Sequence, residues 1–213
     1  MYKVEKPRVV AIGASAGGLA AFQKLLENLP NDTGMAFVLL SHILRNSKSL
    51  LPEILARSTK MQVIQATDGL HLVANHIYVL PPDKLMEIKA GALHLLPRPP
   101  TGVNNAIDHF LFSLAKDRVY GSIGIVLSGE GSDGAEGIKI LKENGGGVTM
   151  AQKPSSAASQ SMPKNAIEID HVDHILTPVE IAHQLASMSW CDSNIKTTPL
   201  KVFWSGGYGT ALA

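Results

Sequence analysis

The chain has 213 residues, of which 45% are hydrophobic and 17% are charged, so it can bury a large core and is not a disordered chain. Its net charge of +1 gives no preference for nucleic acid or an anionic membrane. The longest apolar run, residues 35–40, is too short to cross a bilayer, and residues 1–7 lack the apolar segment of a signal peptide. The single cysteine, Cys191, excludes an intrachain disulfide and a multi-cysteine metal site. We therefore expect a cytoplasmic protein without membrane insertion or a nucleic-acid partner.

Strand-like runs alternate with helical patterns along most of the chain. Apolar runs of the kind found in strands covered on both faces occupy residues 9–12, 35–40 and 122–127, and shorter strands are expected at residues 62–66, 148–152 and 172–176. Helices are predicted at residues 17–28, 105–115, 135–143, 164–169 and 178–188, and after residue 46, where Asn46 or Ser47 would be the N-cap. The first helix has one apolar face, which we expect to be buried, formed by Leu19, Phe22, Leu25, Leu26 and Leu29.

Residues 76–96 break this alternation, because three short strand patterns follow one another, and the last two predict an antiparallel hairpin. The whole pattern predicts an α/β fold: a doubly wound, mostly parallel open sheet that is covered by helices on both faces, with this hairpin inserted. We expect one domain over residues 8–190. Residues 191–213 show no helical period and are expected to form a C-terminal tail.

The first predicted strand runs into a glycine-rich turn around Ser15, with the pattern Gly13-x-Ser15-x-Gly17. Such a turn can hold a nucleophilic serine clear of a sheet, or it can bind a pyrophosphate. A dinucleotide site requires an acidic residue at the end of the second strand, where this chain has Ser41 and His42. The Gly-Lys-[Ser/Thr] motif of a P-loop does not occur in the sequence.

Three polar residues follow three different strands of the predicted sheet: Ser15, His42 and Asp133. Because the carboxyl ends of parallel strands meet at one edge, where ligands bind, we expect these side chains to lie close together. The histidine could take the proton of the serine hydroxyl, and the carboxylate could orient and stabilise the imidazolium. Nearby glycines would expose backbone N–H groups for an oxyanion hole. The chain order serine, histidine, aspartate differs from that of an ordinary α/β-hydrolase.

Each of these residues also has a purely structural interpretation. Ser15 could be the N-cap of the helix that follows it, and Asp133 could cap the helix that begins near Ala135. His42 could be a partly buried histidine with a satisfied hydrogen bond. The placement of all three residues at strand ends favours the catalytic interpretation.

Two other groups of residues could supply a catalytic carboxylate or metal ligands. Asp108 is a rival carboxylate, but its spacing from Asn105 is that of an acidic residue in the first turn of a capped helix. His171 and His174 lack a third ligand at a known spacing, so we expect no metal site.

Together, these motifs resemble the catalytic domain of the bacterial chemotaxis protein-glutamate methylesterases, the CheB family. The resemblance is carried by residues 12–18 (Ile-Gly-Ala-Ser-Ala-Gly-Gly), by Ser41 with His42, and by residues 126–134 (Val-Leu-Ser-Gly-Glu-Gly-Ser-Asp-Gly). It covers residues 9–188, with further matches at residues 78–82, 107–115, 150–152 and 162–167.

The resemblance implies hydrolysis of glutamate γ-methyl esters on the cytoplasmic helices of chemoreceptors or a receptor-like protein, and deamidation of certain receptor glutamines. It implies that Ser15 is the nucleophile, His42 the general base and acid, and Asp133 the orienting carboxylate. The backbone N–H groups of Ala16 and Glu130 would bind the oxyanion, and no cofactor is implied.

The chain departs from the family pattern at three places. Members usually carry methionine at the position of Glu130, threonine at that of Ala16, and a receiver domain where only seven residues precede Arg8. The backbone donor survives at Glu130, whose side chain we expect to point to solvent. Two alternatives to an esterase remain: a non-catalytic esterase-like domain that binds a receptor or sensor partner, and a nucleotide-binding module.

Overall fold

The computed structural model describes residues 6–42, 49–99, 104–117 and 121–192. The strands are β1 (Val9–Ala14), β2 (Ala36–Ser41), β3 (Gln62–Gln65), β4 (Leu70–His71), β5 (His76–Val79), β6 (Lys84–Lys89), β7 (Ala92–Pro97), β8 (Ser122–Val126), β9 (Val148–Gln152) and β10 (His174–Leu176). The helices are α1 (Gly18–Glu27), α2 (Leu51–Leu55), α3 (Ala106–Asp117), α4 (Ala135–Gly145), α5 (Ser161–Glu168) and α6 (Pro178–Asp192), with a 3₁₀ turn, η1, at Pro154–Ser156.

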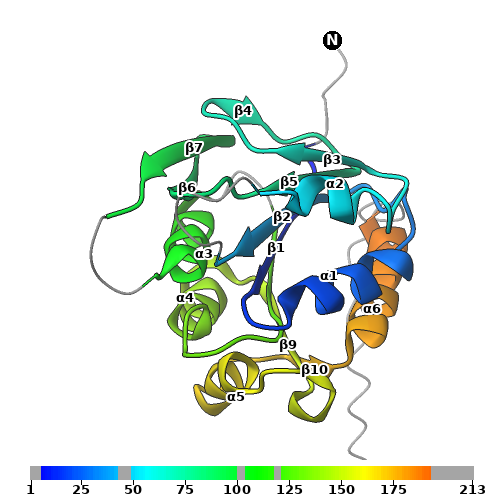
Figure 1. The fold of residues 1–213 in the computed structure, drawn as a ribbon, viewed down its shortest axis with the longest axis vertical. Helices are drawn as coiled ribbons and strands as arrows, with labels where there is room; N and C mark the ends of the chain where they lie inside the picture. Colours follow the sequence, from blue (N-terminus) through cyan, green and yellow to red (C-terminus); the bar gives the residue numbers. More distant parts are fainter. Residues whose placement is uncertain (1–5, 43–48, 100–103, 118–120, 193–213) are drawn as a thin grey trace, which may run out of the picture.

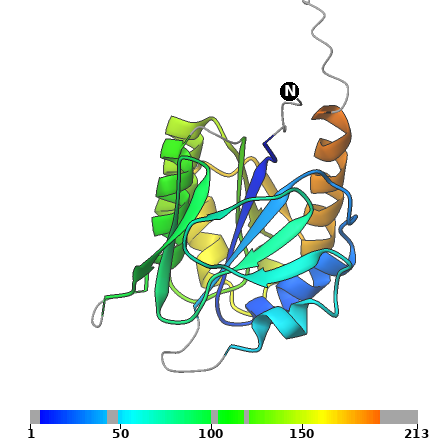
Figure 2. The ribbon, with the colours of Figure 1, turned by 90° about the horizontal axis from the view of Figure 1, so that it is seen from above.

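The main sheet has seven strands in the order β10-β9-β8-β1-β2-β5-β3, and all of its described pairs are parallel. The order reverses between β1 and β8, so the sheet is doubly wound around a switch point beside β1. Helices cover both of its faces, as Figures 1 and 2 show. The predicted fold class is therefore confirmed.

Alternating side chains of the buried strands feed two separate cores. Val10 and Ile12 of β1 pack with α1, α2 and α6, whereas Val9 and Ala11 pack with α3, α4 and α5. All four side chains are at most 1% exposed. Burial on both faces explains why these strands are apolar without alternation.

A second, antiparallel sheet has the order β4-β7-β6. It contains the predicted hairpin, β6 and β7, which pair over six residues each, and β6 packs on α3. β4 was not predicted, because its two residues are too short for a sequence pattern. The hairpin thus lies beside the parallel sheet and forms no part of it (Figure 1).

Two local predictions differ from the structure. Leu19 was expected to be buried, but in the first turn of α1 it is 40% exposed. α6 continues to Asp192, so that Cys191 belongs to this helix, whereas residues 193–213 lie outside the described part. The proposed caps Asn46 and Ser47 also lie outside it. Among the described residues, no helix has the length and apolar character needed to cross a membrane.

Candidate active site

The end of β1 places Ser15 beside the end of β2. In the register of these parallel strands, Ala14 pairs with Ser41, so the next residues on each strand are Ser15 and His42. Neighbouring strands lie about 4.8 Å apart, which brings the two residues to adjacent positions at the carboxyl edge. The strand-end rule therefore located both residues correctly.

The backbone around Ser15 is held by hydrogen bonds on both sides. Its N–H donates to the carbonyl oxygen of Ser128 at 2.9 Å, and its own carbonyl oxygen accepts from the N–H of Gly18 at 2.8 Å. The N-cap of α1 is Gly17, in the left-handed region with φ 73°, and α1 has no side-chain cap. A Cβ on Gly17 would lie 2.6 Å from Cβ of Ala158, so the turn requires glycine there. Ser15 is therefore not a helix cap.

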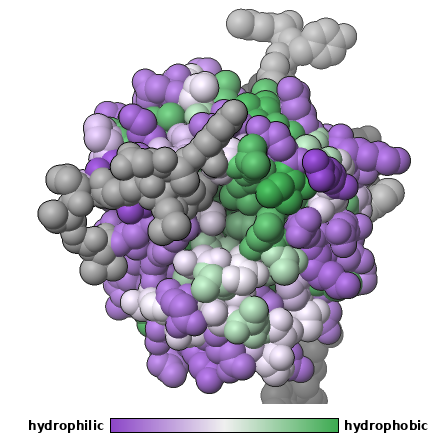
Figure 3. Space-filling view, viewed as in Figure 1, coloured by the Kyte–Doolittle hydropathy of each residue, from purple (hydrophilic) through white to green (hydrophobic). Residues whose placement is uncertain are grey.

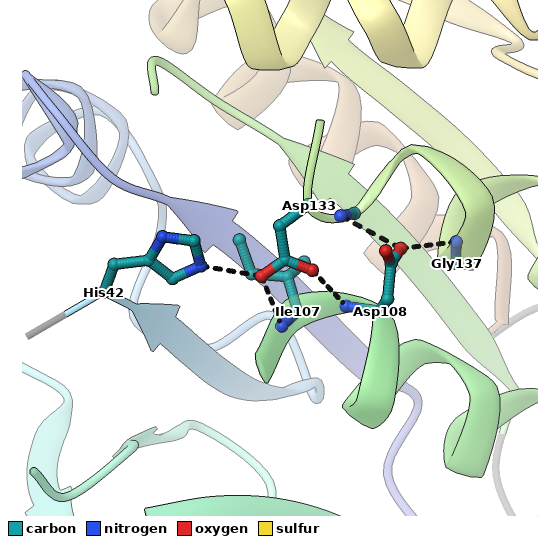
Figure 4. Close-up of polar contacts among 6 residues, drawn as sticks. His42, Ile107, Asp108, Asp133 and Gly137 are labelled. Carbon is teal, nitrogen blue, oxygen red and sulfur yellow. Dashed lines mark hydrogen bonds and ion pairs between the residues drawn. The ribbon is translucent and has the colours of Figure 1, made fainter. Parts of the chain in front are cut away.

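His42 and Asp133 form a short hydrogen bond, 2.6 Å between Nε2 and Oδ2. The same Oδ2 accepts from the N–H of Ile107 at 3.0 Å, and Oδ1 accepts from the N–H of Asp108 at 2.9 Å. Figure 4 shows this arrangement. A carboxylate that accepts all three bonds requires the proton on Nε2 of His42, which leaves Nδ1 as a proton acceptor.

The structure thus joins two of the three predicted catalytic residues by a direct bond. The described residues include no hydrogen bond between the side chains of Ser15 and His42, although the strand register places the two residues at neighbouring strand ends. Ser15 is half-buried, and the side chain of His42 is 19% exposed. Catalytic hydrogen bonds are often long before substrate binds, so the lack of this bond is compatible with a serine nucleophile.

Asp133 does not cap its own helix. Its carboxylate binds the N–H groups of the second and third residues of α3, which is the bonding of an N-cap residue. Asp108 lies in the first turn of α3, as predicted, but its Oδ1 accepts from Gly134 at 2.9 Å and from Gly137 at 2.7 Å, at the start of α4. Asp133, which precedes α4, therefore caps α3, whereas Asp108, which lies in α3, caps α4.

The pKa of Asp108 is raised to about 6 by burial and by the negative charge of Asp133, against the hydrogen bonds from Gly137 and Gly134. The sequence analysis did not predict that Asp108 contacts Asp133, because capping patterns do not show which residues from a distant part of the chain lie beside a helix start.

The loop after β8 lies against Ser15. A Cβ on Gly129 would be 3.0 Å from Cβ of Ser15 and 2.0 Å from Sδ of Met162, so only glycine allows this approach. The described residues offer no hydrogen-bond acceptor to the N–H groups of Ala16 and Glu130, which leaves both donors available. The side chain of Glu130 is exposed, as expected, and accepts from Oγ of Ser161 at 3.2 Å.

A hollow of about 360 Å³ adjoins the turn after β1, and its lining includes Gly17, Ala20, Ser128, Ala158 and Val179. Ser15, His42 and Asp133 do not line this hollow. Figure 3 shows an apolar area over α2, where Leu50 is 55% exposed.

Within the described part of the chain, no three His, Cys, Asp or Glu side chains are grouped as metal ligands.

Known proteins are similar to this chain in sequence and in fold. The family model described as CheB methylesterase matches residues 10–185. A curated relative from Leptospira interrogans is 33% identical over 183 residues, which is 81% of this chain and 90% of the relative. The "Protein-glutamate methylesterase/protein-glutamine glutaminase 3" of Pseudomonas aeruginosa is 35% identical, and the match covers 86% of this chain but only 55% of that protein.

The similarity extends to a solved structure, the "Crystal structure of Thermotoga maritima CheB methylesterase catalytic domain". Its TM-score is 0.76 at 25% sequence identity, and the match covers 86% of this chain and 99% of the catalytic domain. This chain belongs to the CheB methylesterase family.

Proposed function

We propose that this chain is a serine carboxyl-ester hydrolase that removes methyl groups from glutamate γ-methyl esters, with Ser15, His42 and Asp133 as its catalytic residues. The observation that carries the proposal is the 2.6 Å bond between Nε2 of His42 and Oδ2 of Asp133, at the strand end next to Ser15. Family membership supports the reaction, since relatives are named protein-glutamate methylesterase/protein-glutamine glutaminase. The proposed catalytic domain, expected over residues 8–190, extends to the end of α6 at Asp192.

In the first half of the reaction, Oγ of Ser15 attacks the ester carbonyl carbon while Nδ1 of His42 takes the hydroxyl proton. Asp133 stabilises the resulting imidazolium through the hydrogen bond at Nε2. The carbonyl oxygen becomes an oxyanion, which accepts hydrogen bonds from the N–H groups of Ala16 and Glu130. The intermediate collapses when His42 protonates the methoxy oxygen, and methanol leaves.

In the second half, a water molecule attacks the glutamyl ester formed on Ser15. His42 takes a proton from this water and returns it to Oγ of Ser15, so that the glutamate carboxylate is released and the enzyme is restored. A glutamine side chain would follow the same route with ammonia as the leaving group. Neither reaction requires a cofactor, since every proton moves through His42.

The substrate that we propose is a methylated helix of a cytoplasmic chemoreceptor domain or of a receptor-like protein, and we accordingly place this chain in the cytoplasm. A glutamyl ester on a protein must reach Ser15 together with its neighbouring residues. The exposed apolar side chains of Leu19, in the first turn of α1 after Ser15, and of Leu50, at the start of α2, support contact with such a substrate.

Methanol release from a methylated chemoreceptor cytoplasmic domain tests the proposal. The Ser15→Ala variant should lose at least about 10³-fold in kcat, because the nucleophile is removed. Ser187→Ala is the matched control: this exposed serine on α6 donates to the carbonyl oxygen of Gln184 at 2.7 Å and makes no other bond among the described residues, so its loss should not change kcat. Full activity in Ser15→Ala would overturn the proposal. Receptor binding by the wild-type chain without methanol release would favour the non-catalytic domain instead.

A further inference from the structure

We propose that Asp108 is a positioning residue, which fixes the carboxylate of Asp133 toward His42 through a reciprocal pair of helix caps. The catalytic meaning of this inference rests on the function proposed above. Asp108 makes no bond to His42 among the described contacts, so its effect must pass through Asp133.

Each of the two carboxylates binds the start of the helix next to the other carboxylate. Asp133 precedes α4, and its two oxygens accept from the N–H groups of Ile107 and Asp108 in α3. Asp108 belongs to α3, and its Oδ1 accepts from the N–H groups of Gly134 and Gly137 in α4. All four N–H···O distances lie between 2.7 and 3.0 Å (Figure 4).

This exchange restrains the rotation of Asp133. Both of its oxygens are occupied by the start of α3, and the loop that carries Asp133 is held to the same turn of α3 by Asp108. A rotation that breaks the bond to His42 would also leave two N–H groups at a helix start without an acceptor. A buried backbone N–H that loses its acceptor is unfavourable, so the bonds to α3 stabilise the orientation of Asp133 in which it binds His42.

The contact depends on glycine at both positions that bind Asp108. Gly134 has φ 97°, in the left-handed region, and a Cβ there would lie 2.9 Å from Cγ2 of Ile107. A Cβ on Gly137 would lie 2.7 Å from Cβ of Leu111 and 3.0 Å from Oδ1 of Asp108. The lack of side chains at Gly134 and Gly137 therefore lets the starts of α3 and α4 approach closely enough for Asp108 to accept both bonds.

Burial of this pair makes the arrangement electrostatically unfavourable. Asp133 is only 7% exposed, and Asp108 is half-buried beside it. Burial and the charge of Asp133 raise the pKa of Asp108. Serine, threonine or asparagine could cap a helix without bringing a second charge.

The test compares Asp108→Ala with Asp108→Asn in the full-length chain. Alanine removes the acceptor for Gly134 and Gly137, whereas Oδ1 of asparagine can still accept both bonds. The first measurement is the far-downfield proton resonance of His42 Nε2–H, which reports its hydrogen bond to Asp133 and requires no substrate. We expect this resonance to persist in the asparagine variant and to be lost or broadened in the alanine variant.

The second measurement is the steady-state kinetics of methanol release. In Asp108→Ala, kcat should fall about 10- to 100-fold while KM stays within about twofold, because misplacement of Asp133 affects the chemical step. Asp108→Asn should recover most of kcat. Should the alanine variant not fold, Asp108→Ser, whose shorter side chain cannot reach both N–H groups, replaces it with the same expected loss.

Asp173→Ala is the matched control, because Oδ2 of Asp173 also accepts a backbone N–H, from Thr149 at 2.9 Å, but at the amino edge of the sheet. It should change neither the resonance nor kcat. An unchanged resonance and kcat in Asp108→Ala would overturn the inference, as would equal losses in the alanine and asparagine variants. A wild-type chain that shows the resonance but no esterase activity would refute the proposed function while leaving this positioning role supported.

Discussion

The two edges of the main sheet use the same kind of contact under different electrostatic conditions. At the amino edge, Asp173 binds the N–H of Thr149 at 2.9 Å and Nζ of Lys142 at 2.6 Å. Burial raises the pKa of Asp173, but the hydrogen bonds from Lys142 and Thr149 outweigh it and lower the pKa overall. At the carboxyl edge, Asp108 and Asp133 also bind backbone N–H groups, yet they face each other, and the pKa of Asp108 rises to about 6.

The difference separates a stabilising contact from a candidate active site. A lysine neutralises the carboxylate at the amino edge, where nothing in the proposed reaction takes place. At the carboxyl edge the basic partner of Asp133 is His42, whose charge must change during catalysis. Buried carboxyl groups with a strongly shifted pKa are often found at active sites, and Asp108 lies directly beside Asp133, which binds His42.

The largest expected effect is that of Asp133→Asn. The two N–H groups of α3 bind different oxygens of Asp133, and asparagine offers only one acceptor oxygen. It also cannot hold the proton of His42 on Nε2 as a carboxylate does, so kcat should fall about 10³- to 10⁴-fold. Methanol release from methylated receptor domain measures the loss. The corresponding change at the other edge, Asp173→Asn, should leave kcat unchanged. A loss of less than tenfold in Asp133→Asn would remove the distinction between the two edges.

Asp173→Ala should lower stability without affecting activity. The side chain of Asp173 is 29% exposed, and solvent screening limits the contribution of its ion pair, so we expect Tm to fall by about 2–4 °C at pH 7. Because the folded pKa of Asp173 is lowered, this stabilisation is present above about pH 4 and is lost as the pH falls further. Thermal unfolding of both proteins from pH 3 to 7 would show it, and a constant difference in Tm would contradict the assigned ion pair.

Asp108→Asn should show the opposite pH dependence. The folded pKa of Asp108 lies near 6, above its unfolded value of about 4, so the folded wild-type chain binds more protons in between. The wild type should therefore lose stability relative to the variant as the pH rises from about 4 to 6, by about 2 °C in Tm. The same unfolding series measures this effect, and a gain of the wild type over that range would show that Asp108 has been misassigned.

Glu130→Gln should have the smallest effect. The carboxylate is exposed and bonded to Ser161, and the substitution keeps the backbone N–H, so kcat/KM for a small neutral ester should change by less than about twofold. Hydrolysis of such an ester at low and high salt measures the change. An increase of tenfold or more would mean that this carboxylate opposes the developing oxyanion.

Most of the fold could be predicted because its strands are buried on both faces and leave short apolar runs in the sequence. The candidate site could be predicted for a related reason, since Ser15, His42 and Asp133 each follow such a run. The prediction was wrong for Leu19, because helical spacing groups residues on one face but does not show how much of that face the neighbouring elements cover.

The exchange of caps between Asp108 and Asp133 could not be predicted from the sequence. Capping patterns relate a residue to the helix that it precedes or begins, whereas these carboxylates are about 25 positions apart and bind each other's helices. Only the packing of α3 against α4 brings the partners together. The glycines at 134 and 137 were visible in the sequence, but their purpose depends on that packing.

The most direct test of the central claim, that the pair of His42 and Asp133 activates Ser15, is covalent labelling with a fluorophosphonate, which reacts with activated serine hydroxyls. Peptide mapping should place the label on Ser15 of the wild-type chain, and His42→Ala should slow the labelling at least about 10³-fold. A label on a different serine, or labelling of Ser15 at an undiminished rate in His42→Ala, would contradict the account.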